Sequence, residues 1–237
     1  MINELINLLY TPLDLPPVPD FSIDDINKFI DKNYDRDCSF YWRNKETKAR
    51  MGDEYPWNAT HIYYNMDGNG PGWMNDFDKE FPQLAEYFNS VLGMPIEECG
   101  HLMMLPIKKG HTGLGFWHSD PDGLGIRMYI EFDNIGENKL LMKRTKEPYE
   151  QKVSFPYPID HSVMQDEVLE CKTLSHRQWF YLNNIRAIHS TYTGVKDSNR
   201  IALFICSRKD NWEKFLFNLS HTILESAKKY KDYSIYW

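Results

Sequence analysis

The sequence predicts one mainly β domain, with helices before and after its sheet. The central part, from His101 to Cys206, consists of short segments rich in β-branched and aromatic residues. Turn signals such as Lys109-Gly110 and Asn183-Asn184 separate these segments. With 237 residues, 42% of them hydrophobic, the chain can bury one core without being divided into domains. We expect this domain, residues 1–237, to have a helical and loop part at 1–100, a sheet core at 101–207 and a C-terminal helix at 208–237.

Three segments outside the sheet core follow the period of an amphipathic helix. The first begins at Ser22 and has Asp25 three residues later, which is typical of a capped helix N-terminus. The second runs over about 81–92, and the third over about 210–230. The third carries an apolar stripe that predicts packing against the sheet or a second subunit. Its members are Trp212, Phe215, Leu216, Leu219, Ile223 and Leu224.

The composition of the chain limits which binding partners and which cellular compartment are expected. The formal net charge is -7 and no long run of Lys or Arg is present, so no nucleic-acid partner is expected. Residues 1–17 include acids and prolines, which argues against a secretory signal or a membrane span. The cysteines are far apart and form no CxxC pair, which favours reduced thiols in the cytoplasm. They are Cys38, Cys99, Cys171 and Cys206.

Two histidines and one aspartate have the composition of an open iron site. His118 and Asp120 are two residues apart, so in an extended segment their side chains project to the same side. His189, 69 residues beyond Asp120, lies in an apolar, strand-like context that suits a third ligand. Such a set leaves three positions open on Fe(II) for a chelating co-substrate and dioxygen. The alternative is that the spacing is accidental and that His189 is a core residue.

Arg200 adds weight to the metal interpretation. It opens an alternating strand eleven residues after His189. If 196–199 is the turn between two antiparallel strands, the guanidinium group returns beside the metal ligand. Its planar fork of donors then suits the distal carboxylate of 2-oxoglutarate. The alternative for Arg200 is a surface ion pair.

The pattern of His118, Asp120, His189 and Arg200 resembles that of the Fe(II)/2-oxoglutarate dioxygenases, over roughly 102–206. The resemblance implies a mainly β fold, with a double-stranded β-helix (jelly roll) core and flanking N-terminal and C-terminal helices. It also implies Fe(II) as cofactor and 2-oxoglutarate as co-substrate. The implied reaction is hydroxylation of an amino acid or a peptidyl residue, coupled to conversion of 2-oxoglutarate into succinate and CO2. No catalytic side chain is expected beyond the metal site.

Within that superfamily, the segment 118–130 resembles the aspartyl/asparaginyl β-hydroxylase-like group. In that group an arginine nine residues after the first metal histidine helps to hold 2-oxoglutarate, and Arg127 has this position. His189 and Arg200 are similar to the group's second histidine ligand and its co-substrate arginine. Asp120 is a departure from those members that lack the carboxylate ligand, and it favours the small-molecule amino-acid hydroxylases of the group.

The strand around Arg127 agrees with a role inside a cavity. Arg127, Tyr129 and Glu131 alternate with apolar residues, so we expect a polar row lining the cavity and an apolar row under a helix. The alternative is a polar row that faces solvent. Three aromatic residues are expected to pack around the site: Trp117, Trp179 and Tyr181.

Substrate choice is expected to rest with loops at the mouth of the roll, placed at 38–72 and 143–166. These loops hold Tyr55, Trp57, Arg144 and Tyr149. Free amino acids and peptides both remain open as substrates, and no membrane partner is expected. The main alternative function is a cupin-like metal- or ligand-binding jelly roll without oxygenase activity; another is an interaction module. A homodimer through the C-terminal helix is a further expectation.

Overall fold

The computed structural model describes residues 2–37, 60–64, 72–73, 75–91, 96, 100–106, 113–114, 117–118, 125–132, 138–146, 161–172, 177–183, 187–193, 200–207 and 212–237. The helices are α1 (Ile2–Asn7), α2 (Ile23–Asp37), α5 (Phe77–Glu80), α6 (Pro82–Val91), α7 (Trp212–Lys229) and the short 3-10 helix η2 (His161–Val163). No helix in these ranges is both long and apolar enough to cross a membrane.

The strands form two sheets. The larger sheet contains β1 (Leu8–Pro12), β2 (Thr60–Tyr64), β3 (Gly72–Trp73), β4 (Gly100–Pro106), β6 (Gly125–Phe132), β9 (Trp179–Leu182), β11 (Arg200–Ser207) and β12 (Ile235–Tyr236). The smaller sheet contains β5 (Gly113–Leu114), β7 (Asn138–Lys143), β8 (Leu169–Cys171) and β10 (Ile188–Thr193). Their orders are β12-β1-β9-β6-β11-β4-β2-β3 and β5-β10-β7-β8. Strands β4 to β11 fall at 100–207, whereas β1, β2, β3 and β12 lie in the parts of the chain for which helices and loops were expected.

The three predicted helices are confirmed as α2, α6 and α7. At the start of α2, the Ser22 hydroxyl accepts a hydrogen bond from the amide of Asp25 at 3.3 Å, as the sequence pattern predicts. Helix α1 and strand β1 were not predicted. Of the expected mouth loop at 38–72, the structure describes β2 and Gly72 of β3, and residues 38–59 and 65–71 lie outside the described part.

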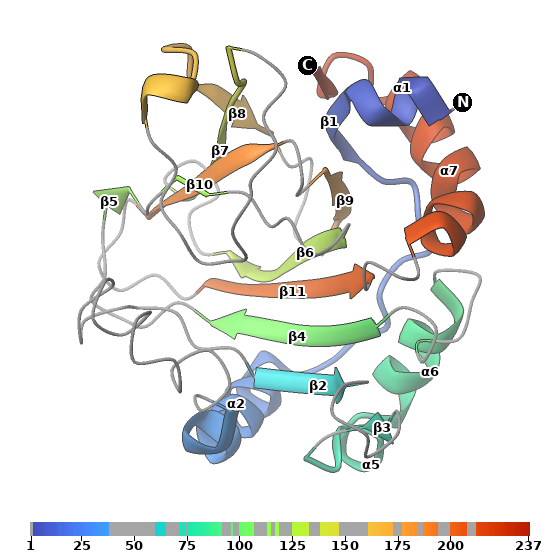
Figure 1. Ribbon diagram of the computed structural model, residues 1–237. Helices are drawn as coiled ribbons and strands as arrows, with labels where there is room; N and C mark the ends of the chain where they lie inside the picture. Colours follow the sequence, from blue (N-terminus) through green and yellow to red (C-terminus); the bar gives the residue numbers. More distant parts are fainter. Residues whose placement is uncertain are drawn as a thin grey trace.

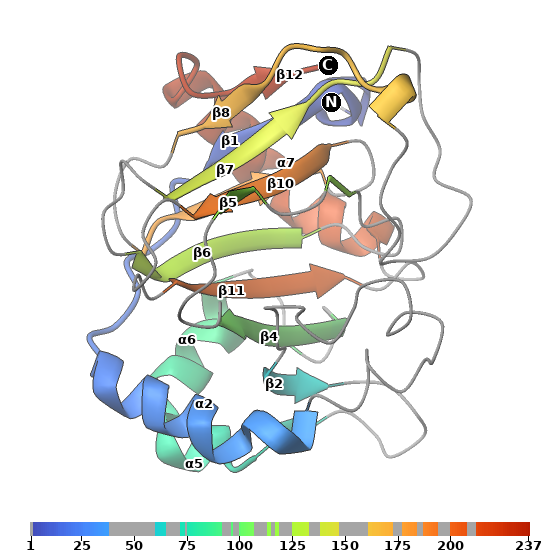
Figure 2. The same cartoon turned by 90° about the vertical axis from the view of Figure 1, so that its left-hand side faces the viewer.

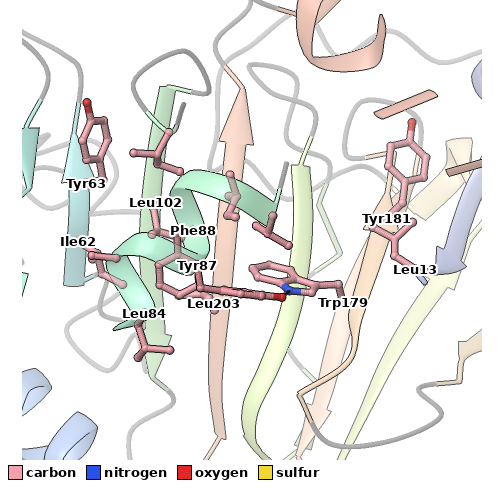
Figure 3. Packing of buried hydrophobic residues seen from close by; sticks show 14 of the residues in the cluster. Leu13, Ile62, Tyr63, Leu84, Tyr87, Phe88, Leu102, Trp179, Tyr181 and Leu203 are labelled. Atoms are coloured by element: carbon pink, nitrogen blue, oxygen red, sulfur yellow. Dashed lines mark hydrogen bonds between the residues drawn. The ribbon is translucent and has the colours of Figure 1, made fainter. Parts of the chain in front are cut away.

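One face of the larger sheet packs under helices. Figures 1 and 2 show α6 and α7 on one side of this sheet and the strands of the smaller sheet on the other. Helix α6 contributes Tyr87 and Phe88 to the helix-covered core. The rings of Phe88 and of Trp179 from β9 pack edge to face, with their centroids 6.4 Å apart. Burial of this kind is the main favourable contribution to folding. Figure 3 shows these side chains between the strands and α6.

Two consecutive hydrogen bonds, which share the Tyr87 hydroxyl, cross the helix-covered core. The indole Nε1 of Trp179 donates to the Tyr87 hydroxyl at 2.7 Å, and that hydroxyl donates to the carbonyl of Pro16 at 2.7 Å. Burial raises the pKa of the Tyr87 hydroxyl to about 12, against a smaller opposing effect of the bond from Trp179. These two hydrogen bonds connect α6 to β9 and to the segment after β1.

The other face of the larger sheet meets the smaller sheet. Phe180 and Leu182 of β9 lie in one buried cluster with Leu140 and Met142 of β7. Trp179 and Tyr181 alternate with them along β9 and belong to the helix-covered core. The expectation that Trp179 and Tyr181 pack around the site is therefore wrong, because strand alternation turns them to the other face.

The expected pairing of the two strands on either side of 196–199 is also wrong, and residues 196–199 themselves lie outside the described part. Strand β10 pairs with β5 and β7 in the smaller sheet, whereas β11 pairs with β4 and β6 in the larger one. The two strands follow each other in the chain but lie in different sheets. Arg200 thus cannot reach the site through hairpin pairing with β10, and its position follows from the register of the larger sheet.

Candidate metal site

His118 and His189 meet across a short antiparallel bridge. The His118 amide donates to the His189 carbonyl at 3.0 Å, and the His189 amide donates to the His118 carbonyl at 2.8 Å. Residues directly opposite each other in such a pair project to the same side. Their ring centroids are 4.2 Å apart. The structure therefore brings together two of the three predicted metal ligands.

The imidazole of His189 is held in one orientation. The residue is fully buried, and its Nδ1 lies 2.9 Å from the carbonyl oxygen of Ala187. Because a carbonyl only accepts hydrogen bonds, Nδ1 carries a proton. In the neutral ring, Nε2 then keeps the lone pair that a metal ion requires. A bond of this type is the usual support for a metal-binding histidine.

The histidine pair lies on the inner face of the smaller sheet. His189 is directly opposite Met142 of β7, and Met142 packs with Phe180 of the larger sheet. Opposite residues share a face, so the His189 side chain projects between the two sheets. His118 is only partly buried, whereas His189 is fully buried. The pair thus extends from the interior of the sandwich toward its surface.

Trp117 lies beside the site on the outer face of the smaller sheet. Its side chain is buried in one cluster with Ile188 and Met164. The ammonium nitrogen of Lys143 lies 5.5 Å from the centre of the Trp117 ring. Of the three aromatic residues expected around the site, Trp117 is the one that adjoins it.

The backbone register places Arg127 and Arg200 on one face of the larger sheet. Arg127 is directly opposite Phe180, whose side chain meets the smaller sheet. Arg200 precedes Ile201, which is buried in the helix-covered core, so alternation assigns Arg200 to the opposite face. Both arginines therefore occupy positions on the face turned toward the smaller sheet. Asp120 lies outside the described residues.

The expected polar row on β6 is interrupted. Between β6 and β11 the register shifts, so that Tyr129 is opposite Ala202 but Glu131 is opposite Ile201. One extra residue in β6 reverses the alternation at this point, as in a β-bulge. Glu131 therefore leaves the face shared by Arg127 and Tyr129. A regular alternation in sequence could not reveal this shift.

The expected mouth residues are described only in part. Tyr55, Trp57 and Tyr149 lie outside the described residues. Arg144 forms an ion pair with Glu167 at 3.1 Å, and its Nε donates to the carbonyl of Tyr236 at 2.8 Å. These bonds hold Arg144 between β7 and β12.

Sequence reasoning missed Ala187 and Lys143. A backbone carbonyl that orients His189 leaves no signal in residue type. The approach of Lys143 to Trp117 depends on the pairing of β7 with β10, which is non-local. Across the described ranges, no three His, Cys, Asp or Glu side chains are grouped to hold a metal ion. Asp120, the expected third ligand, is not among the residues searched.

Comparison with known proteins finds no matching family model and no matching curated protein. Solved structures do resemble this one. The epimerase SnoN in complex with Fe3+, alpha ketoglutarate and nogalamycin RO aligns with a TM-score of 0.45 at 10% identity, covering 87% of this chain and 81% of that one. EvdMO1 aligns with a TM-score of 0.43 at 16% identity, covering 88% of this chain and 49% of that one, so this chain spans about half its length.

A third solved structure is an oxidoreductase of the 2OG-Fe(II) oxygenase family from Burkholderia pseudomallei. It aligns with a TM-score of 0.36 at 8% identity, covering 68% of this chain and 72% of that one. The structures that resemble this chain thus include a 2OG-Fe(II) oxygenase. Likenesses of this size show neither the family nor the function of this chain. None of the three is described as an aspartyl/asparaginyl β-hydroxylase, so that placement stays a prediction.

Proposed function

We propose that this chain is an Fe(II)- and 2-oxoglutarate-dependent oxygenase in which His118, Asp120 and His189 bind the iron. The observation that supports it best is the bridge that presents the His118 and His189 rings side by side between two sheets, 4.2 Å apart. Two imidazoles and one carboxylate form the donor set of non-haem Fe(II) oxygenases. The Ala187 carbonyl, by binding Nδ1 of His189, leaves Nε2 for the metal. The two histidines therefore fit the ion.

The proposal includes a jelly-roll fold. From β4 to β7 the chain alternates between the larger and the smaller sheet, and from β8 to β11 it alternates again. In the larger sheet β4-β11-β6-β9 are neighbours, and in the smaller sheet β5-β10-β7-β8 are neighbours. This winding is what an eight-stranded roll with a site between its sheets requires. It supports a double-stranded β-helix.

Bound iron together with 2-oxoglutarate and dioxygen would supply the oxidising chemistry, with succinate and CO2 as by-products. The two histidines would hold the ion from the smaller sheet and leave its other side open. Arg200 would bind the distal carboxylate of 2-oxoglutarate through its two-point fork, and Arg127 would hold the iron-proximal end. Both occupy the inward face of the opposite sheet by register. Apolar Met142 and Phe180 would exclude water from the inner side of the site.

The proposed substrate is an amino acid or a peptidyl residue. The decisive experiment is succinate formation from 2-oxoglutarate by the Fe(II)-loaded protein, across a panel of free amino acids and short peptides. We expect substrate-dependent succinate in the wild-type protein and none in Arg200→Ala. An anaerobic titration should give the charge-transfer absorption of a keto acid chelating iron. Metal binding without 2-oxoglutarate binding would instead support a metal-binding jelly roll.

A further inference from the structure

The segment that carries His118 is held in an irregular register. Strand β5 pairs Leu114 with Tyr192, and the bridge pairs His118 with His189. From Leu114 to His118 the chain advances four residues, whereas from Tyr192 back to His189 it advances three. One extra residue therefore lies on the His118 side, as in a β-bulge. A regular register would place Trp117, not His118, opposite His189.

A single bridge is a weak constraint on this choice of register. Two backbone hydrogen bonds join His118 to His189, and each contributes only about 0.5 to 1.5 kcal/mol net. A one-residue slip would turn the other set of side chains inward. Contacts of the side chains next to the bridge are thus needed to select His118. Trp117 is the large buried side chain at that place.

Trp117 is confined by three parts of the chain. Ile188, which precedes His189, shares its cluster, and Lys143 lies directly opposite Ile188 with its ammonium group 5.5 Å from the ring centre. Met164 shares the cluster and forms a bridge with Thr145, just after β7. The Trp117 ring therefore packs on the outer face of β7 and β10, and the inner face of β10 presents His189.

The residues around Met164 are themselves anchored. The amide of Gln165 donates to the carbonyl of Arg144 at 2.9 Å, and the amide of Lys146 donates to the carbonyl of Val163 at 3.0 Å. The Met164 side chain is 1% exposed. The surroundings of the indole are thus fixed by backbone bonds to the end of β7.

We propose that Trp117, confined by Lys143, Ile188 and Met164, is a positioning residue that selects the register in which His118 faces His189. Lys143 contributes a cation–π contact on the ring. This inference rests on the proposed function, because its consequence is the geometry of the metal site.

Metal titrations test whether Trp117 affects the geometry of the metal site. Mn(II) is used to measure affinity, and Co(II) is used for its visible ligand-field absorption. We expect Trp117→Leu to weaken binding about 10- to 100-fold, as for other residues that orient ligands, and to alter the Co(II) spectrum. Lys143→Met should weaken binding about two- to fivefold, and Lys143→Arg should restore it. Lys139→Met is the matched control. Lys139 lies on the same strand and face as Lys143 but pairs with Glu170, so this change should leave both readouts unaltered.

A double-mutant cycle identifies the residue through which Trp117 acts. In a His118→Ala background, Trp117→Leu should change the remaining Mn(II) affinity less than it does in the wild-type protein, because Asp120 is then the proposed ligand left on that segment. An undiminished effect of Trp117→Leu in that background would overturn the proposal, since Trp117 would then act on another part of the site.

Hydrogen exchange of the metal-free protein tests the positioning role of Trp117 independently of the proposed function. We expect the amide of His118 to exchange faster in Trp117→Leu and Lys143→Met, while the amides of β9 and β11 stay protected. If Trp117→Leu does not fold, Lys143→Met gives the answer. Unchanged exchange at His118 in the folded variants refutes the positioning role. A wild-type protein that binds no metal refutes the proposed function, and exchange then decides the positioning role alone.

Discussion

The two faces of the larger sheet differ in what they enclose. The face under α2, α6 and α7 is filled by large aromatic side chains, among them Phe29, Phe88 and Trp179. The face toward the smaller sheet has a smaller apolar cluster, and beside it lies the buried imidazole of His189. One face of the sheet thus packs a large apolar core, whereas the other holds the candidate metal site beside a smaller core. Changes on the two faces should then have separable effects.

The largest effect is expected from removing a proposed ligand on the inner face. His189→Ala should weaken Mn(II) or Fe(II) binding by more than about 100-fold, beyond the range for residues that only orient ligands. Metal stoichiometry by equilibrium dialysis measures this. His221→Ala, at an exposed position of α7, is the control and should bind normally. Full stoichiometry in His189→Ala would show that another residue is the ligand.

On the helix-covered face, Trp179→Ala should cost stability without touching the ligands. Deleting this buried indole should lower the free energy of unfolding by about 3 to 5 kcal/mol, because it leaves a cavity and strips a hydrogen-bond donor from the core. Urea unfolding measures the loss. Below the unfolding transition, metal affinity should equal that of the wild-type protein. A folded Trp179→Ala protein that had lost its metal site would refute the separation of the two faces.

A smaller effect is expected from Tyr87→Phe, which leaves the indole donor of Trp179 and the carbonyl of Pro16 without the hydroxyl. The cost should be about 1 to 3 kcal/mol near neutral pH. The pKa of Tyr87 is raised in the folded state from 10.0 to about 12, so the folded state keeps its proton where the unfolded state has lost it.

The wild-type protein should therefore lose this contribution as the pH rises from 10 to about 12. In Tyr87→Phe that part of the pH dependence should be absent. Unfolding free energies of both proteins, measured across this range, give the comparison. Parallel curves would show that Tyr87 does not titrate as its burial requires.

The smallest effect is expected from Phe217→Ala on α7, whose side chain is 82% exposed. Stability should change by no more than about 0.5 kcal/mol, whereas Leu219→Ala on the buried side of the same helix should cost about 2 to 5 kcal/mol. If α7 forms the proposed homodimer, Phe217→Ala should lower the sedimentation coefficient at constant stability. A large loss of stability in the monomer would place Phe217 in the core.

The fold was predictable where its signals are local. Ser22 and Asp25 lie within one helical turn, so their sequence alone defines the start of α2. Strand β1 carries no such signal, because all five of its residues are buried and the alternation typical of a strand is missing. It is recognisable only once β9 and β12 are placed on either side of it.

For the candidate site, the sequence indicated residue types but not geometry. The spacing in the sequence indicated His118 and His189, and the structure brings them together. The assignment of β10 and β11 to different sheets was not predictable from their short connection, because pairing partners are chosen over long distances in the chain. The extra residue in β6 was hidden for the same reason, since a register shift exists only relative to a neighbouring strand.

The place of β11 in the larger sheet has a consequence for how this protein is made. Strand β11 lies between β4 and β6, although it follows both in the chain. A ribosome-bound chain therefore carries β4 and β6 with facing open edges until β11 emerges. Long-range pairing of this kind folds slowly, and open strand edges recruit other chains. Synthesis interrupted before Arg200 should thus yield aggregates, and recovery of the native protein should depend on chaperones that shield those two edges.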